Sequence, residues 1–133
     1  MEYRLSKLTQ MLKNDRFASH NSIQLISVGT GEAKAEMIVS ENHLNGVNII
    51  QGGALFTLAD FAFAAASNSH GRIAVAANAS INFYKGVSSG KLTATAREEN
   101  SGKSLSSYTV DITDETGVKI AQFSGTAFLK GEY

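Results

Sequence analysis

Residues 51–69, QGGALFTLADFAFAAASNS, are the stretch that decides the fold. Alanine, leucine and phenylalanine fill most of its positions, which predicts a helix over about 17 residues, 53–69. Because this helix is apolar on nearly every side, we expect it to be buried all round rather than to lie on a surface. Asp60 within it is the only formal charge between residues 41 and 72. Since burying an unpaired carboxylate is unfavourable, Asp60 either has a structural partner or occupies a site that uses its reactivity.

Length and composition indicate one folded domain. The chain has 133 residues, of which 43% are hydrophobic and 18% charged, and we expect a single domain over residues 1–133. Twelve basic residues balance twelve acidic ones without forming a basic stripe, which argues against a nucleic-acid partner. Cysteine is absent, which excludes disulfides and cysteine-ligated metals, and no histidine–carboxylate spacing indicates a metal site. No signal peptide or membrane-spanning run is visible, so we expect a cytoplasmic protein with no membrane partner.

The remaining segments are predicted to form one short helix and six strands. Leucines at helical spacing predict an amphipathic helix over residues 2–13, and two strands should follow, joined by a turn at residues 29–31. After the buried helix, alternating patterns predict four strands between residues 72 and 130, the last two joined by a turn at residues 114–117. Short turns indicate an antiparallel sheet, and a helix that is apolar on all faces requires this sheet to curve around it. The predicted class is therefore α+β.

The strand expected just after the buried helix has an apolar and a polar face. Its apolar face is predicted to carry Ile73, Val75, Ala77, Ala79, Ile81 and Phe83. Its polar face is predicted to carry Asn78, Ser80, Asn82 and Tyr84. This assignment assumes that the period of two continues without interruption along the strand.

The start of the buried helix is a candidate site for a carbonyl oxygen. Gly52 and Gly53 have no side chains, so a ligand can approach their backbone closely. The first N–H groups of a helix have no partner within it, and the helix dipole favours negative charge there. These amides could form an oxyanion hole, with Asp60 acting as a general base or as a nucleophile.

One helix cannot place both groups on the same substrate atom. Gly53 and Asp60 are seven residues apart, which is roughly 10 Å along a helix. The attacking atom and the oxyanion donor must each lie about 3 Å from one carbonyl group. Two antiparallel copies of the helix, related by a twofold axis, satisfy this condition. We therefore predict a homodimer with two composite sites.

The segment NHLNGVNIIQGGALFTLADFAFAAASNS, residues 42–69, resembles the active-site segment of the PaaI-type hot-dog thioesterases. That family shares an Asn-Gly loop, a Gly-Gly helix start and a Leu-Ala-Asp in the helix. The likeness continues through AVAANASINFYKG (74–86) and FSGTAFL (123–129) and covers nearly all the chain after residue 20. The resemblance implies the hot-dog fold, an antiparallel sheet wrapped around a long central helix. It also implies hydrolysis of acyl-coenzyme A thioesters without a metal or added cofactor, in a dimer or a dimer of dimers.

The resemblance assigns roles to four residues of the segment. Asp60 matches the family's catalytic aspartate, and Gly53 matches the backbone donor to the thioester oxygen. Asn45 matches the loop asparagine that holds the water or the substrate. Gln51 stands where many members have histidine. Because glutamine can donate a hydrogen bond but does not titrate near neutral pH, we expect it to orient the carbonyl or the loop.

A second group of residues is expected to contact the substrate. The set is Gly52, Ser80, Asn82, Lys85 and Lys103. Ser80 matches a hydroxyl position near the family's carboxylate. Lys85 follows the strand where the family often has Arg-Pro, and it could contact a phosphate of coenzyme A. Lys85, Lys103 and Arg97 could equally be solvated surface charges.

Other interpretations remain open at the level of the sequence. Asp60 could be a structural residue, and the protein could bind acyl-CoA without hydrolysing it. A hot-dog hydratase is disfavoured, because such enzymes generally need a titrating histidine–carboxylate pair. His43 is expected to be structural or solvated. The identity of the acyl group is not predicted.

Overall fold

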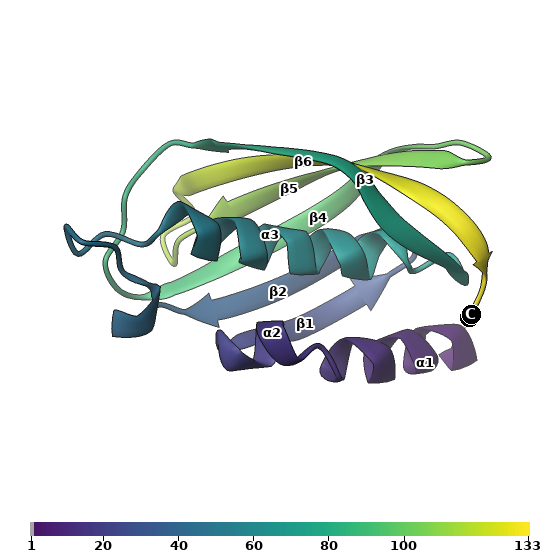
Figure 1. The fold of residues 1–133 in the computed structure, drawn as a ribbon, viewed down its shortest axis with the longest axis horizontal. Helices are drawn as coiled ribbons and strands as arrows, with labels where there is room; N and C mark the ends of the chain where they lie inside the picture. The colour runs from purple at the N-terminus through teal and green to yellow at the C-terminus, as the bar shows by residue number, and fades with distance from the viewer. Residues whose placement is uncertain (1) are drawn as a thin grey trace.

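The computed structural model describes residues 2–133 as two short N-terminal helices, a six-stranded sheet and one long helix (Figure 1). The helices are α1 (Glu2–Lys13), α2 (Arg16–His20) and α3 (Gly52–Ser67), with a 3-10 turn η1 (Glu41–His43). The strands are β1 (Ile23–Gly29), β2 (Glu32–Ile38), β3 (Arg72–Phe83), β4 (Lys91–Ser101), β5 (Leu105–Thr113) and β6 (Lys119–Glu132). None of the helices in this described part of the chain is long and apolar enough to cross a membrane. Helix α2 was not expected from the sequence.

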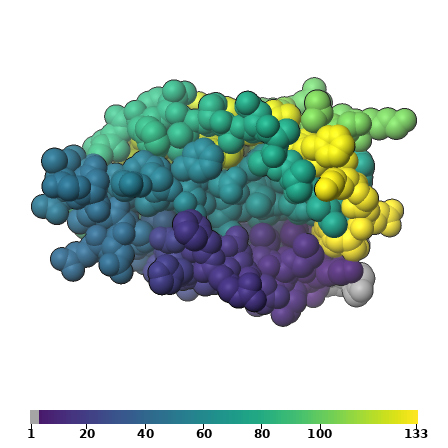
Figure 2. Space-filling model, in the orientation of Figure 1, coloured from purple at the N-terminus to yellow at the C-terminus, as the bar shows by residue number. Residues whose placement is uncertain are grey.

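The strands form one antiparallel sheet in the order β1-β2-β4-β5-β6-β3, and α3 lies across its concave side. The expected α+β architecture, a sheet curved around a central helix, is confirmed. β1 forms one edge and is covered by α1 and α2 (Figure 1), whereas β3 forms the other edge. In Figure 2, atoms in the teal of α3 remain visible between the purple N-terminal helices and the green and yellow strands. One face of α3 therefore reaches the surface of the protomer.

The ends of α3 differ slightly from the expected residues 53–69 because side chains decide where the helix begins and ends. Gln51 is the N-cap residue, so the helix starts at Gly52. At the other end, the Asn68 side chain donates to the Ala64 carbonyl at 2.8 Å and accepts from the Ala74 N–H at 2.9 Å. Asn68 therefore ends the helix and ties it to the first residues of β3.

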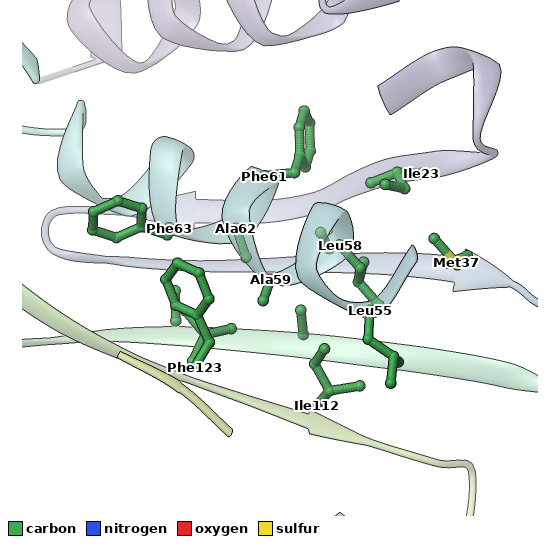
Figure 3. Close-up of a cluster of buried hydrophobic side chains, with 14 of the residues drawn as sticks. Ile23, Met37, Leu55, Leu58, Ala59, Phe61, Ala62, Phe63, Ile112 and Phe123 are labelled. Carbon is green, nitrogen blue, oxygen red and sulfur yellow. The ribbon is translucent and has the colours of Figure 1, made fainter. Parts of the chain in front are cut away.

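The core forms where the apolar side chains of α3 meet small residues on the sheet. Alanines of β2 and β4 that face the helix are almost fully buried: Ala33, Ala35, Ala94 and Ala96. Phe63 and Phe123 pack with ring centroids 5.4 Å apart, and both are labelled in Figure 3. A Cβ added to Gly125 would lie 2.9 Å from both of these rings, so glycine is needed at this position. Small residues on the sheet thus allow the aromatic residues of α3 to approach it closely.

The expected faces of β3 are wrong for the first half of the strand. The pairing with β6 shifts by one residue between Ala76 and Asn78, which is a β-bulge. Beyond the bulge, Ala79 and Ile81 pack against the core as predicted. Before it the alternation is reversed, so Ala74 faces the core while Ile73 and Val75 are exposed. One inserted residue exchanges the two faces because side chains alternate with a period of two.

Replacing Phe123 should cause one of the largest losses of stability in the chain. Its side chain is fully buried and contacts two other rings, so Phe123→Ala should lower the free energy of unfolding by about 3–5 kcal/mol. Chemical denaturation at fixed protein concentration measures this change. Phe128→Ala, which truncates a half-exposed ring on the same strand, is the control. Equal losses in the two variants would contradict the described core.

Candidate active site at the start of the central helix

The first turn of α3 has one backbone amide without an acceptor. The Gln51 carbonyl accepts from the N–H groups of Ala54 (2.9 Å) and Leu55 (3.3 Å). The Gln51 side-chain Oε1 accepts from the Gly53 N–H at 2.9 Å. The Gly52 N–H has no acceptor among the described residues 2–133. The amide left open at the positive end of the helix dipole is therefore that of Gly52, whereas Gly53, the expected donor, is occupied by Gln51.

Asn45 holds the loop before the helix in shape. Its Oδ1 accepts from the N–H groups of Val47 (3.0 Å) and Ile49 (3.1 Å), and its own N–H donates to the Ile49 carbonyl at 2.8 Å. The loop also contains Asn48 with a φ of 62°. With the carbonyl oxygen of its side chain used in this way, Asn45 can offer only its Nδ2 group to a ligand.

His43 is buried and held by hydrogen bonds at both ring nitrogens, as expected of a structural histidine. Its Nδ1 accepts from the Ser40 N–H at 3.0 Å, and its Nε2 lies 3.0 Å from the Asn21 carbonyl, to which it donates. Nδ1 therefore carries no proton. This ring joins the loop of residues 41–51 to the end of α2, and both of its nitrogens are used.

Asp60 lies on the face of α3 that points away from the sheet. A helix advances two turns in about seven residues, so Gly53 and Asp60 share this face with Thr57 between them. The Asp60 side chain is half-buried and has no hydrogen bond or ion pair to any residue of the described chain. Burial, with a smaller contribution from the charge of Asp15, raises the pKa of Asp60 above its ordinary value. The carboxylate is thus exposed enough to react and is stabilised by no partner.

Two pockets flank the first turn of α3. One has a volume of about 560 Å³ and is lined by Asn45, Gln51, Gly53 and Thr57, with Phe17 of α2. The other has a volume of about 430 Å³ and is lined by Gly52, Leu55, Phe83, Tyr84 and Lys85, among others. Neither pocket includes Asp60. Within one protomer, the helix start and the carboxylate therefore do not converge on a single site.

The remaining predicted substrate contacts are scattered in the protomer. Ser80 pairs with Ser124, and Asn82 pairs with Gln122, so both lie on the face of the sheet opposite α3. Lys103 lies in the β4–β5 turn, where its carbonyl accepts from Arg72 at 3.1 Å. Of the expected set, only Gly52 and Lys85 share a pocket. The expectation that Ser80 lies near the Asp60 carboxylate is not met within the protomer, because alternation directs its side chain away from the helix.

Sequence reasoning missed three features of this region. Thr57 lines the larger pocket, and its hydroxyl donates to the Gly53 carbonyl at 2.8 Å. Phe17 lines the same pocket from a helix that was not predicted. The open amide of Gly52 depends on the side-chain rotamer of Gln51. Only Thr57 left a signal in the sequence, because it lies one turn before Asp60 on the same helical face.

Comparison with known proteins identifies the family. The model of the thioesterase superfamily matches residues 47–121, which include α3. Acyl-coenzyme A thioesterase PaaI of Escherichia coli is 40% identical over 116 residues, which cover 86% of this chain and 83% of that protein. The solved structure of the E. coli PaaI protein from the phenylacetic acid degradation operon matches with a TM-score of 0.92 at 35% identity, covering 98% of this chain and 96% of that chain. A Streptococcus mutans structure bound to acetyl CoA matches with a TM-score of 0.79 at 26% identity, covering 83% of this chain and 90% of that chain. The chain belongs to the thioesterase superfamily, as a PaaI-type hot-dog protein.

Proposed function

We propose that this thioester hydrolase acts on acyl-coenzyme A, using Asp60 of one subunit and the amide end of α3 of another. The observation that carries the proposal is the unpartnered Asp60 carboxylate on the open face of α3, two turns from an unoccupied amide. The reaction adds water to the thioester carbonyl and breaks the carbon–sulfur bond, which gives a carboxylic acid and free coenzyme A. The acetyl-CoA ligand of the S. mutans relative supports this choice of substrate class.

Asp60 is suited to either of two roles in this reaction. As a general base it would take a proton from water as the water oxygen attacks the carbonyl. As a nucleophile it would attack the carbonyl itself and form an acyl anhydride, which water then opens. In both cases poor solvation makes the carboxylate more reactive, which agrees with the raised pKa of Asp60. The thiolate is a good leaving group, so neither role requires a strong general acid.

The oxyanion that forms on the carbonyl needs donors that are already in place. The Gly52 N–H is open, and the Gly53 N–H, to which the Gln51 side chain is hydrogen-bonded in the free protein, lies next to it on the first turn of α3. We therefore expect two amides, those of Gly52 and Gly53, to donate to the oxyanion, where the sequence indicated Gly53 alone. Lys85 lies in the pocket that Gly52 borders and is the candidate contact for a coenzyme A phosphate.

A dimer through β3 would complete the site. β3 is a twelve-residue edge strand whose only charged residue is Arg72 at its start, and it has no proline, so nothing in it discourages pairing with another strand. Antiparallel pairing of two β3 strands about a twofold axis would continue the sheet and place two antiparallel α3 helices on the same side. The open face of α3 carries Gly53, Thr57, Asp60 and Ala64, whose small size permits close approach. Asp60 would then face the first turn of the partner's α3.

Removing the charge of Asp60 should abolish hydrolysis without unfolding the protein. Asp60→Asn and Asp60→Ala should each lower kcat at least about 100-fold on a panel of short-chain, medium-chain and aryl acyl-CoAs, measured by thiol release. Asp111→Asn is the matched control, because it makes the same chemical change on the opposite face of the sheet. Wild-type turnover by both Asp60 variants would remove Asp60 from the mechanism. Tight acyl-CoA binding by wild-type protein without any thiol release would instead indicate the non-catalytic alternative.

The same Asp60→Asn variant should be more stable than the wild type at neutral pH. Because the pKa of Asp60 is raised in the folded state, the native protein binds the proton more tightly than the unfolded chain. The loss of stability caused by burying the charge therefore grows as the pH rises from the pKa of the unfolded chain to that of the folded protein. Above the folded pKa this loss stays constant. Urea denaturation at matched protein concentration should show a higher free energy of unfolding for the variant than for the wild type at pH 7. This difference should disappear below about pH 4.

Asp111→Asn should change the free energy of unfolding at pH 7 in the opposite direction from Asp60→Asn. Burial favours a higher pKa for Asp111, but hydrogen bonds from Gln122, Arg97 and Lys119 outweigh it and hold the pKa below the ordinary value. Loss of this carboxylate should therefore destabilise the protein at pH 7, with the difference disappearing as pH falls through the folded pKa. If both variants shifted stability in the same direction at pH 7, burial of the Asp60 charge would not be the cause of its effect.

Proline at position 52 tests the proposed amide with little disturbance of the helix. Proline is favourable at the first helical position and has no N–H, and Gln51 already has the extended conformation, ψ 138°, that precedes proline. Gly52→Pro should therefore lower kcat about 10²–10³-fold. Gly52→Ala keeps the N–H and meets the same contact with the Phe83 ring, where an added Cβ would lie 3.0 Å from Cζ. It should stay active.

Mixing two inactive variants then tests whether the site is shared between subunits. A heterodimer of Asp60→Asn and Gly52→Pro subunits would contain one intact site, because the Asp60 of one subunit and the Gly52 amide of the other are both native. Activity should return when the two proteins are unfolded and refolded together. If it does not return although heterodimers form, the two groups belong to one subunit or do not act together.

A further inference from the structure

The side chain of Gln51 occupies a position that the proposed reaction needs. Its Oε1 accepts from the Gly53 N–H at 2.9 Å, and an added Cβ on Gly53 would lie 2.5 Å from this oxygen. The side chain is therefore folded back over the glycine, next to the open Gly52 N–H. An amide oxygen and a thioester oxygen are both carbonyl acceptors, so Gln51 occupies this donor much as a substrate oxygen would.

We propose that Gln51 is a displaceable cap: its amide oxygen holds the Gly53 N–H in the free protein and leaves when a thioester carbonyl binds. This inference rests on the proposed function. With the cap displaced, the amides of Gly52 and Gly53 both reach the carbonyl oxygen, and the developing oxyanion gains a second donor. No covalent bond forms or breaks in this step, which exchanges one hydrogen-bond acceptor for another.

The surroundings of Gln51 permit this movement. The residue is exposed, and its contact with Gly53 is the one hydrogen bond that its side chain makes within residues 2–133. The larger pocket, about 560 Å³, borders Gln51 and gives the released side chain room. The backbone of Gln51 is held independently, because its N–H donates to the His43 carbonyl at 2.8 Å and its own carbonyl caps the helix. Gln51 thus acts as a positioning residue, whose side chain can leave while its backbone stays in place.

A neutral cap is required for this exchange. A carboxylate of nearly the same shape would accept the Gly53 N–H more strongly and would be favoured by the helix dipole. It would remain on the amide when substrate arrives, and its charge would oppose the oxyanion. Glutamine caps the helix with a weaker hydrogen bond and without a charge that opposes the oxyanion. Its side chain also does not gain or lose a proton near neutral pH.

Gln51→Glu separates the two roles of this side chain, since it strengthens the cap and blocks its release. We expect its thermal midpoint to equal or exceed the wild-type value, while kcat for acyl-CoA falls about 100-fold, as for loss of one oxyanion donor. The ratio of wild-type to variant kcat at the same pH should narrow as the pH falls below about 4, because protonation removes the charge of the introduced carboxylate. Gln51→Ala, which leaves the Gly53 N–H open, should lose a few degrees of thermal midpoint, and its loss of kcat should be much smaller than that of Gln51→Glu.

Asn68→Ala is the matched control for loss of stability. It removes side-chain hydrogen bonds at the opposite end of α3, so its thermal midpoint should fall while kcat is unchanged. Full activity of Gln51→Glu would show that Gln51 is only a structural cap. A loss in Gln51→Ala as large as in Gln51→Glu would show that the glutamine amide itself assists the reaction, and would also overturn the proposal. Absence of thiol release from the wild type would instead refute the proposed function.

Discussion

The packing of α3 against the concave side of the sheet is the contact on which the other features of the structure depend. Leu58, Ala59 and Ala62 are fully buried there, and the alanines of β2 and β4 let the helix come close. Three sides of a helix packed in this way are shielded from solvent, and the fourth side is a narrow face of small residues. Asp60 lies on that face, where the surrounding apolar residues reduce its solvation and no basic residue of the described chain pairs with it. The raised pKa of the carboxylate is therefore a consequence of how the helix is buried.

The same packing fixes the direction of the helix dipole. α3 begins at the edge of the core, where Gly52 lies beside Phe83 at the end of β3. The two glycines at its start consequently border pockets. Because the helix is anchored along its length, these amides are held in place before any ligand arrives, and preorganised donors are the most effective kind in stabilising an oxyanion. The capped Gly53 and open Gly52 amides are both products of this one rigid helix start.

Much of the fold could be predicted from the sequence because its strongest patterns are local. The apolar run of α3 and the alternating strands identify the elements, and Asp60 stands out as the one charge within the helix. The β-bulge between Ala76 and Asn78 left no such signal, since the apolar residues continue through it, and it exchanged the expected faces of Ile73 and Val75. The site was less predictable for the same reason: whether an amide is open depends on one side-chain rotamer, which composition and spacing do not determine.

The two unsatisfied features of the protomer point to a common explanation. β3 presents an unpaired edge, which proteins normally protect, and Asp60 presents a charge without a partner, which proteins normally avoid. The proposed twofold dimer would pair the two edges and would bring the carboxylate toward the partner's helix start, where the proposed reaction needs it. In the proposed dimer, the interface and the active site would depend on the same contact, and the unfavourable burial of the Asp60 charge would remain as a requirement of the reaction.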